Sequence, residues 1–222
     1  MSFRPATEAA TGGAEPPPNC QSCPRLAAFR GRNRALFPDF FNAPVPAFGP
    51  LDASLIIVGL APGLKGANRT GRPFTGDYAG DLLYATLLQQ GRACGQYDKR
   101  PDDGLTLQDT RIVNAVRCVP PENKPTGAEI NACAGFLKAE FAGVTNVKAI
   151  LALGGIAFGA VLQAQGLRKS YAKFGHGAQV TLPTGPQLIG SYHCSRYNTN
   201  TGRLTTTMFE TVMRQAIFAA NA

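Results

Sequence analysis

The chain has 222 residues, a length that suits one domain or one domain with a short appendage. Hydrophobic residues make up 44% of it, so there is ample material for a buried core. Charged residues make up only 16%, and 22 basic against 14 acidic side chains give a formal net charge of +8. This basic surplus favours a polyanionic partner over an acidic disordered tail, although a merely solvated surface would show the same balance.

We expect neither a membrane helix nor a secretory signal in this chain. No apolar run approaches the roughly 20 residues that span a bilayer, and the first residues lack an apolar core segment. We therefore expect a cytoplasmic protein without membrane contact. Residues 1–18 are rich in Ala, Gly and Pro and end in three prolines, which predicts a disordered lead-in before a single domain at residues 19–222.

Beyond this lead-in, strand-like and helix-like segments alternate. Short apolar runs that end at glycine, proline or polar residues predict strands at residues 54–63, 110–121, 147–155 and 186–193. Apolar residues at helical spacing predict helices at residues 79–90, 126–141, 156–165 and 205–220. The second of these opens with a capping-box pattern of Thr126 and Glu129. The alternation predicts a three-layer α/β/α sandwich around a mainly parallel sheet.

Several polar or glycine residues fall where the predicted strands end. In open α/β sheets, ligands bind beyond the carboxyl ends of the strands, and Gly59, Asn114, Gly154 and His193 all occupy such ends. The glycine-rich stretch after the first strand matches neither G-x-x-x-x-G-K-[ST] nor G-x-G-x-x-G, so a nucleotide-binding loop is unsupported. The polar stretch HCSRYNTNTGRLT after the fourth strand carries guanidinium, hydroxyl and amide groups that can bond phosphates.

Four of the six cysteines have a spacing that suits a metal centre. They form a C-x2-C pair, a long gap and a C-x14-C pair, made by Cys20, Cys23, Cys118 and Cys133. Structural disulfides are disfavoured in a reducing compartment, so four thiolates point to zinc or to an iron–sulfur cubane. The wide second pair suits a cluster that ties an N-terminal arm to the domain. Cys94 and Cys194 lack partners at useful spacing and are interpreted as small, semi-buried hydrophobic residues.

Three motifs resemble one known family. GLAPG…NRTGRPFTGD, NAVRC-PPENKP and HCSRYNTNTGRLT, together with the four cysteines, resemble the type 5 uracil-DNA glycosylases, an iron–sulfur branch of the uracil-DNA glycosylase superfamily. The likeness extends from Cys20 to Thr205. It implies a monofunctional DNA repair enzyme that flips uracil, and other deaminated bases such as hypoxanthine, out of double-stranded DNA and hydrolyses the N-glycosidic bond. It also implies a [4Fe-4S] cluster on the four cysteines, and we expect a monomer.

The resemblance assigns roles to residues of the three motifs. Asp77 would position the hydrolytic water and stabilise the sugar cation, Asn114 would read the base edge, and His193 would donate to a base carbonyl. Phe74 would stack on the flipped base. The backbone at Gly59, Leu60 and Ala61 would line the pocket. The loop after His193 would grip DNA and insert Arg196 or Tyr197 into the vacated space, through the residues Ser195, Arg196, Tyr197, Asn198, Asn200 and Arg203.

Departures and alternatives remain at this point. Type 4 relatives carry an acidic residue where this chain has Leu60, so the hydrolytic carboxylate must lie elsewhere. Asp77 could serve only as a helix N-cap, Phe74 only as a core residue, and Asn123 could replace Asn114 as the base reader. A non-catalytic iron–sulfur module that binds nucleic acid, or an electron-transfer protein, would share the cysteines and the charge.

Overall fold

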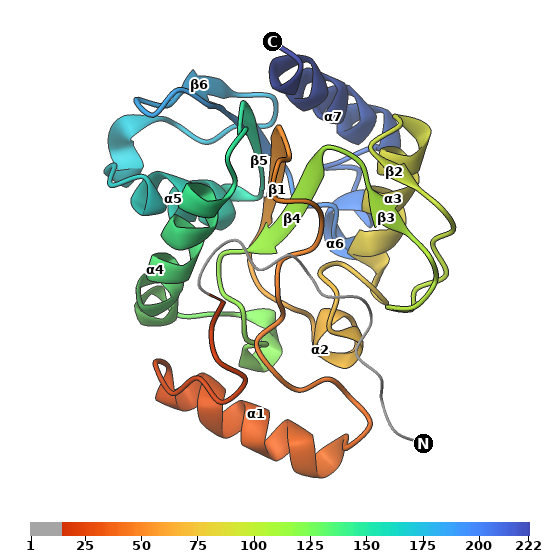
Figure 1. Ribbon diagram of the computed structural model, residues 1–222, viewed down its shortest axis with the longest axis vertical. Helices are drawn as coiled ribbons and strands as arrows, with labels where there is room; N and C mark the ends of the chain where they lie inside the picture. The colour runs from red at the N-terminus through yellow and green to blue at the C-terminus, as the bar shows by residue number, and fades with distance from the viewer. Residues whose placement is uncertain (1–14) are drawn as a thin grey trace.

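A five-stranded sheet forms the centre of the computed structural model, which describes residues 15–222 (Figure 1). The strand order is β4-β1-β5-β7-β6. Four strands are parallel and the edge strand β6 pairs antiparallel with β7. Their bounds are β1 Leu55–Gly59, β4 Thr110–Asn114, β5 Ala149–Leu153, β6 Gln179–Thr181 and β7 Gln187–Ser191. The predicted mainly parallel sheet is confirmed, although each predicted strand extends into the loop that follows it.

Helices cover both faces of this sheet. The apolar side chains of β1 alternate, so that Ile56 and Val58 face one helical layer while Leu55 and Ile57 face the other. The first layer contains α4 (Gly127–Gly143) and α5 (Gly155–Ala164), and the second contains α3 (Tyr78–Gln89) and α7 (Thr206–Ala220). The predicted three-layer sandwich is therefore confirmed. The predicted capping box at Thr126 and Glu129 is also present at the start of α4.

The sequence patterns missed the shorter elements and one long helix. The long helix is α1, and the short elements are α2, α6, the edge strand β6, the antiparallel pair β2 and β3, and the 3-10 turns η1 and η2. Their bounds are α1 Pro24–Leu36, α2 Ala67–Thr70, β2 Ala93–Cys94, β3 Thr106–Leu107, η1 Pro121–Asn123, η2 Lys169–Tyr171 and α6 Arg196–Asn200. Helix α1 buries Leu26, Arg30 and Asn33, a face at helical spacing that is mostly polar. Hydrophobic periodicity could not reveal such a face.

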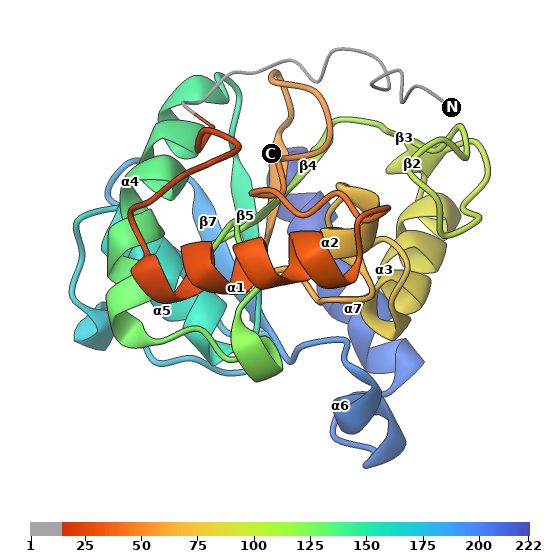
Figure 2. The ribbon, with the colours of Figure 1, turned by 90° about the horizontal axis from the view of Figure 1, so that it is seen from below.

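The strand order changes direction at β1. Strand β4 pairs with one side of β1 and β5 with the other, so β1 marks the switch point where open α/β sheets bind ligands. The register places Gly59 directly beside Asn114 at the carboxyl ends of β1 and β4. Figure 2, which views the molecule from below, shows α1 running across the front beside α2, with α6 projecting at the margin.

The edge of the sheet at β4 is covered by the segments that precede β1. Phe48 forms an antiparallel bridge with Ile112, and the backbone N–H of Val45 donates to the carbonyl of Arg117. Residues 1–14 of the predicted lead-in lie outside the described residues. Glu15, within the predicted lead-in, forms an ion pair of 3.0 Å with the buried Arg117. Across residues 15–222, no helix is both long and apolar enough to cross a membrane.

Candidate active site

Two predicted site residues meet at the end of β1. A Cβ atom placed on Gly59 would lie 2.6 Å from Cζ of Phe74 and closer still to Oδ1 of Asn114. Both side chains therefore lie against the bare Cα of Gly59, and only glycine leaves room for them. This close approach explains a glycine at a position whose backbone is an ordinary strand. The structure thus brings Gly59, Asn114 and Phe74 together at the carboxyl ends of β1 and β4.

The amide oxygen of Asn114 is buried without a partner. Asn114 is 3% exposed, and its Oδ1 receives no hydrogen bond from the described residues. Buried acceptors are almost always satisfied, so this oxygen is suited to accept from a ligand N–H. Asn123, the alternative base reader, is exposed in the 3-10 turn η1 and has a positive φ of 57°. The structure thus places Asn114, and not Asn123, beside Gly59 and Phe74.

The ring of Phe74 lies between β1 and the end of β7. Its centroid is 6.0 Å from that of His193, with 30° between the two planes. Phe74 is 6% exposed and has a φ of +53°, a left-handed conformation that is uncommon for a bulky residue. Such strain often marks a functional site. Burial lowers the pKa of His193, so its imidazole is neutral at pH 7 and offers one N–H and one lone pair.

Asp77 has the helix-capping role that the sequence offered as one of two possibilities. It is the N-cap of α3, and its side chain accepts a hydrogen bond of 3.1 Å from the N–H of Gly80. The other carboxylate oxygen faces the loop after β1, because a Cβ atom on Gly66 would lie 2.5 Å from Oδ2 of Asp77. Burial raises the pKa of Asp77, partly offset by the Gly80 bond. The cap therefore uses Oδ1 of Asp77 and does not use Oδ2.

The segment after β7 connects His193 to the start of α3. The thiol of Cys194 is fully buried and donates to the carbonyl of Ala79 at 3.4 Å, two residues beyond Asp77. The sequence predicts a semi-buried Cys194, whereas the structure buries this residue completely. The backbone of Leu60 accepts from the N–H of Val116, and Leu60 and Ala61 are half-buried at the end of β1.

The predicted DNA-binding loop is partly helical. Ser195 caps α6, and the amide of Asn198 donates to the carbonyl of His193 at 2.8 Å. The guanidinium of Arg196 lies 5.2 Å from the ring centroid of Tyr78, the residue next to Asp77. Tyr197 is 72% exposed. The predicted polar loop is therefore helical over Arg196–Asn200, because the Ser195 side chain caps the first turn there.

Arg203 and Asn200 complete the predicted DNA-binding set. The guanidinium of Arg203 lies 4.8 Å from the ring centroid of Tyr192, which itself stacks on His176. Both Asn200 and Arg203 are exposed at the end of α6 or just beyond it. These positions leave their polar groups accessible to a backbone phosphate.

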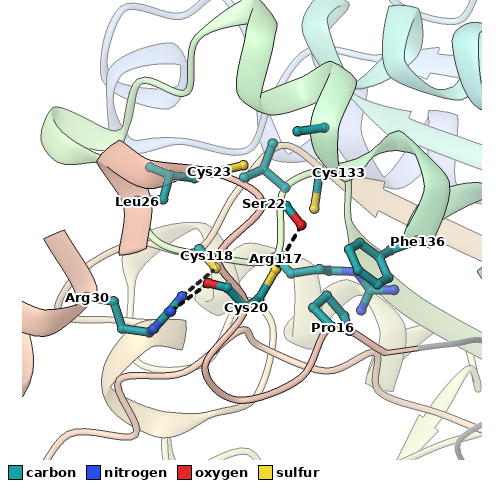
Figure 3. Close-up of a pocket in the computed structure, with 12 residues that line it drawn as sticks. Pro16, Cys20, Ser22, Cys23, Leu26, Arg30, Arg117, Cys118, Cys133 and Phe136 are labelled. Atoms are coloured by element: carbon teal, nitrogen blue, oxygen red, sulfur yellow. Dashed lines mark hydrogen bonds between the residues drawn. The ribbon is translucent and has the colours of Figure 1, made fainter. Parts of the chain in front are cut away.

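The four predicted metal ligands line one cavity. Cys20 and Cys23 precede α1, Cys118 follows β4, and Cys133 lies on α4, yet all four thiols point toward a common space (Figure 3). Burial, with a smaller contribution from the neighbouring Cys133, raises the pKa of Cys23 to about 11. Within residues 15–222, no three His, Cys, Asp or Glu side chains are placed to hold a single metal ion.

Cationic groups surround the thiols. Arg30 is 4% exposed, and its guanidinium donates to the carbonyl of Cys20 at 2.7 Å and to the thiol of Cys118 at 3.5 Å (Figure 3). A backbone hydrogen bond from Arg117 to Cys133 lowers the pKa of that thiol against the effect of burial. Four sulfurs with a buried arginine suit the donor set of an anionic thiolate cluster. In contrast, Cys94 is exposed on β2, so its interpretation as semi-buried is wrong.

The fold and these side chains define an open-sheet α/β protein with its candidate site at the carboxyl edge of the sheet. A profile of the Uracil DNA glycosylase superfamily matches residues 46–216, and the chain belongs to this superfamily. It is 46% identical over 202 residues to the type-5 uracil-DNA glycosylase of Thermus thermophilus, covering 89% of this chain and 92% of that protein. The resemblance seen in the motifs is confirmed.

Other relatives extend the comparison. The type-5 uracil-DNA glycosylase of Pyrobaculum aerophilum is 39% identical over 202 residues, covering 89% of this chain and 88% of that protein. The type-4 uracil-DNA glycosylase of Thermotoga maritima is 33% identical over only 148 residues, or 66% of this chain and 67% of that protein. The match to the type-5 proteins is thus both longer and higher in identity.

Proposed function

We propose that this protein removes uracil from DNA by hydrolysing the bond between the base and deoxyribose. The observation that carries the proposal is the buried, unpartnered Oδ1 of Asn114, which lies with the Phe74 ring against Gly59 at the switch point of the sheet. Uracil has a flat face for the ring and an N–H for the amide oxygen. The relatives named as type-5 uracil-DNA glycosylases support the same substrate.

The chemical step needs one group that stabilises the leaving base and another that accepts a proton from the attacking water. The electron pair of the N-glycosidic bond leaves with the base, and the neutral imidazole of His193 stabilises the resulting charge by donating to a carbonyl oxygen. Water adds to the sugar carbon and gives a proton to the carboxylate of Asp77. Asp77 then releases this proton, through solvent, to the departed uracil anion, so that neutral uracil and an abasic site result and the carboxylate is regenerated. Since Leu60 carries no carboxylate, Asp77 takes this role.

We assign α6 to the duplex that surrounds the flipped nucleotide. Of the two predicted wedge residues, Arg196 rests on Tyr78 while Tyr197 is mostly exposed. A free aromatic side chain can enter the space that the base leaves, and this contact offsets part of the unstacking cost. Tyr197 is therefore our choice for the wedge. Arg196 and Arg203 would contact phosphates, with Ser195, Asn198 and Asn200 beside them.

We also propose a [4Fe-4S] cluster at the four-cysteine cavity. Cys20, Cys23, Cys118 and Cys133 would be its ligands, because they approach one space from three separate segments. Base hydrolysis needs no electrons, so the cluster would serve to hold α1 against β4 and α4. Purified protein should absorb broadly near about 400 nm and contain iron and sulfide. A colourless preparation with stoichiometric zinc would overturn this proposal.

The test for a bound cluster has a matched control within the chain. Replacing Cys118 by Ser removes one proposed ligand, whereas Cys94→Ser changes an exposed cysteine on β2. We expect the first change to lower the iron content and the absorption, and the second to leave both unchanged.

One gel assay tests the activity. The protein is incubated with a uracil-containing duplex, abasic sites are cleaved with alkali, and the strand is sized. A shortened strand supports the proposal, while binding without cleavage would indicate a non-catalytic nucleic-acid-binding module. Duplexes that carry hypoxanthine extend the test to other deaminated bases, which we include in the proposal. Sedimentation with and without DNA tests the expected monomer.

A further inference from the structure

A buried arginine lies at the centre of the turn that carries Phe74. Arg72 forms a bidentate ion pair with Asp103, with both N···O distances 2.8 Å. The Asp103 side chain is fully buried and that of Arg72 is 6% exposed. Burial alone would raise the pKa of Asp103, but hydrogen bonds from Arg72 and from two backbone N–H groups lower it to about 2. Asp103 therefore stays ionised at neutral pH.

Aromatic rings enclose the guanidinium on several sides. Its Cζ atom lies 5.2 Å from the ring centroid of Phe48, 5.5 Å from that of Tyr84 and 5.9 Å from that of Tyr97. The rings of Tyr84 and Tyr97 are themselves 4.6 Å apart. These rings come from three separate parts of the chain: the segment before β1, helix α3 and the connection between β2 and β3. Arg72 therefore fixes where these segments meet.

The same groups hold the backbone on both sides of Phe74. Tyr84 donates to the carbonyl of Pro73 at 2.6 Å, and Tyr97 donates to the carbonyl of Phe74 at 3.2 Å. The N–H of Gly76 donates to the Tyr97 hydroxyl at 3.4 Å. Arg72 Nε donates to the hydroxyl of Thr75 at 2.7 Å. Every residue from 73 to 76 is thus bonded to Arg72, Tyr84 or Tyr97.

We propose that Arg72 and Tyr97 are positioning residues that hold Phe74 in its left-handed conformation, with its ring turned toward Gly59 and His193. A phenylalanine at positive φ needs outside support, and the hydroxyl of Tyr97 supplies it directly at the Phe74 carbonyl. Arg72 acts through Tyr84, Tyr97 and Thr75. The link to base excision rests on the proposed function, whereas the structural claim does not.

The first test does not depend on catalysis. The chain has only two histidines, so isotope-labelled His193 and His176 give two resolvable imidazole signals in an NMR spectrum. The Phe74 ring, 6.0 Å away, shifts the His193 signal, and Phe74→Ala reports the size of that shift. Tyr97→Phe and Arg72→Lys should each move the His193 signal toward its position in Phe74→Ala, while the His176 signal stays in place. An unmoved His193 signal in both variants overturns the proposal.

The second test separates positioning from general stability. Tyr97→Phe removes one hydroxyl and should slow single-turnover uracil release by about 3- to 10-fold, the usual effect of one neutral hydrogen bond. In a Phe74→Ala background the same change should have no further effect, because its effect passes through the Phe74 ring. Equal losses in both backgrounds would show that Tyr97 acts elsewhere. If the wild type released no uracil while the NMR shifts appeared, the proposed function would fail and the positioning role would stand.

Arg72→Lys separates the positive charge of Arg72 from its hydrogen-bonding geometry. Lysine keeps the positive charge but cannot give Asp103 and Thr75 a planar fork. Its effect on the His193 signal should therefore exceed that of Tyr97→Phe. Thermal unfolding of each variant identifies any protein that has lost its fold, and the spectra are compared only below the transition.

Discussion

Asp77 can be tested as a catalytic group because asparagine retains its capping role. The carboxylate accepts one hydrogen bond from Gly80 at the start of α3, and asparagine caps helices about as well as aspartate. Asp77→Asn should therefore keep α3 intact, whereas Asp77→Ala loses the cap and about 1 kcal/mol of stability. For a chain of this length, that loss corresponds to about 2–4 °C in Tm. Both variants should slow base release by about 100-fold or more.

The sign of the pKa shift sharpens this experiment. Burial raises the folded-state pKa of Asp77, so ionisation of this carboxyl costs stability at pH values above that pKa. Asp77→Asn removes this cost, and at pH 7 it should unfold at the same temperature as the wild type or higher. The wild-type rate should fall as the pH drops through a pKa above 3.8, the ordinary carboxyl value. The profile of Asp77→Asn should lack this limb.

The control is a helix cap in the helical layer on the other face of the sheet. Thr126 caps α4 through the N–H of Glu129, so Thr126→Ala should lose a similar amount of stability while keeping normal turnover. Single-turnover rates and thermal unfolding on the same four proteins give the answer. Near-wild-type turnover in Asp77→Asn would refute the catalytic role and leave Asp77 as a helix cap alone.

Four further predictions follow from the same structure. Asn114→Ala should lower uracil release by about 100-fold in the gel assay without lowering the free energy of unfolding, since the amide oxygen it removes is buried and unpaired. Tyr197→Ala should reduce base flipping, measured by 2-aminopurine fluorescence beside the uracil, while thermal unfolding stays unchanged because the side chain is exposed. Arg196→Ala should lower the slope of log affinity against log salt by about 1 relative to the wild type. Asp103→Asn leaves the buried charge of Arg72 unpaired and should cost about 3–5 kcal/mol at pH 7. This difference should shrink as the pH falls from about 4 to 2, because Asp103 contributes stability only while ionised; a constant difference would contradict the ion pair's role.

The main sheet could be predicted because its sequence pattern is simple. Buried parallel strands are continuous apolar runs, and their glycine or polar ends gave the positions of Gly59, Asn114 and His193. The same logic failed for α1, whose buried face contains Arg30 and Asn33. That face is polar because it meets thiols and backbone carbonyls instead of a hydrophobic core. A periodicity of apolar residues carries no information about such a helix.

The support for Phe74 could not be predicted from spacing either. Arg72 precedes Phe74 by two residues, but Asp103 and Tyr97 lie in the connection between β2 and β3, which has no strong pattern of its own. Only the fold brings them together. The motif GRPFTGD therefore contains Phe74 and Asp77, which we propose contact the flipped nucleotide, together with the supporting residue Arg72. Tyr97 and Asp103, which complete the support, come from a segment with no visible link to the motif.

Residues that contact a ligand are easier to recognise in a sequence than residues that support them, and this difference has a physical cause. A residue that contacts a ligand must present a particular chemical group, so its type is constrained and its motif is recognisable. A supporting residue needs only to fill space and complete hydrogen bonds, and many sequences can do that around the same turn. Arg72 and Arg30 are exceptions. A buried guanidinium lowers the stability of the fold unless ion pairs and hydrogen bonds satisfy it, so its surroundings are constrained. A buried arginine beside a motif is thus the feature by which support of this kind can be recognised once the fold is known.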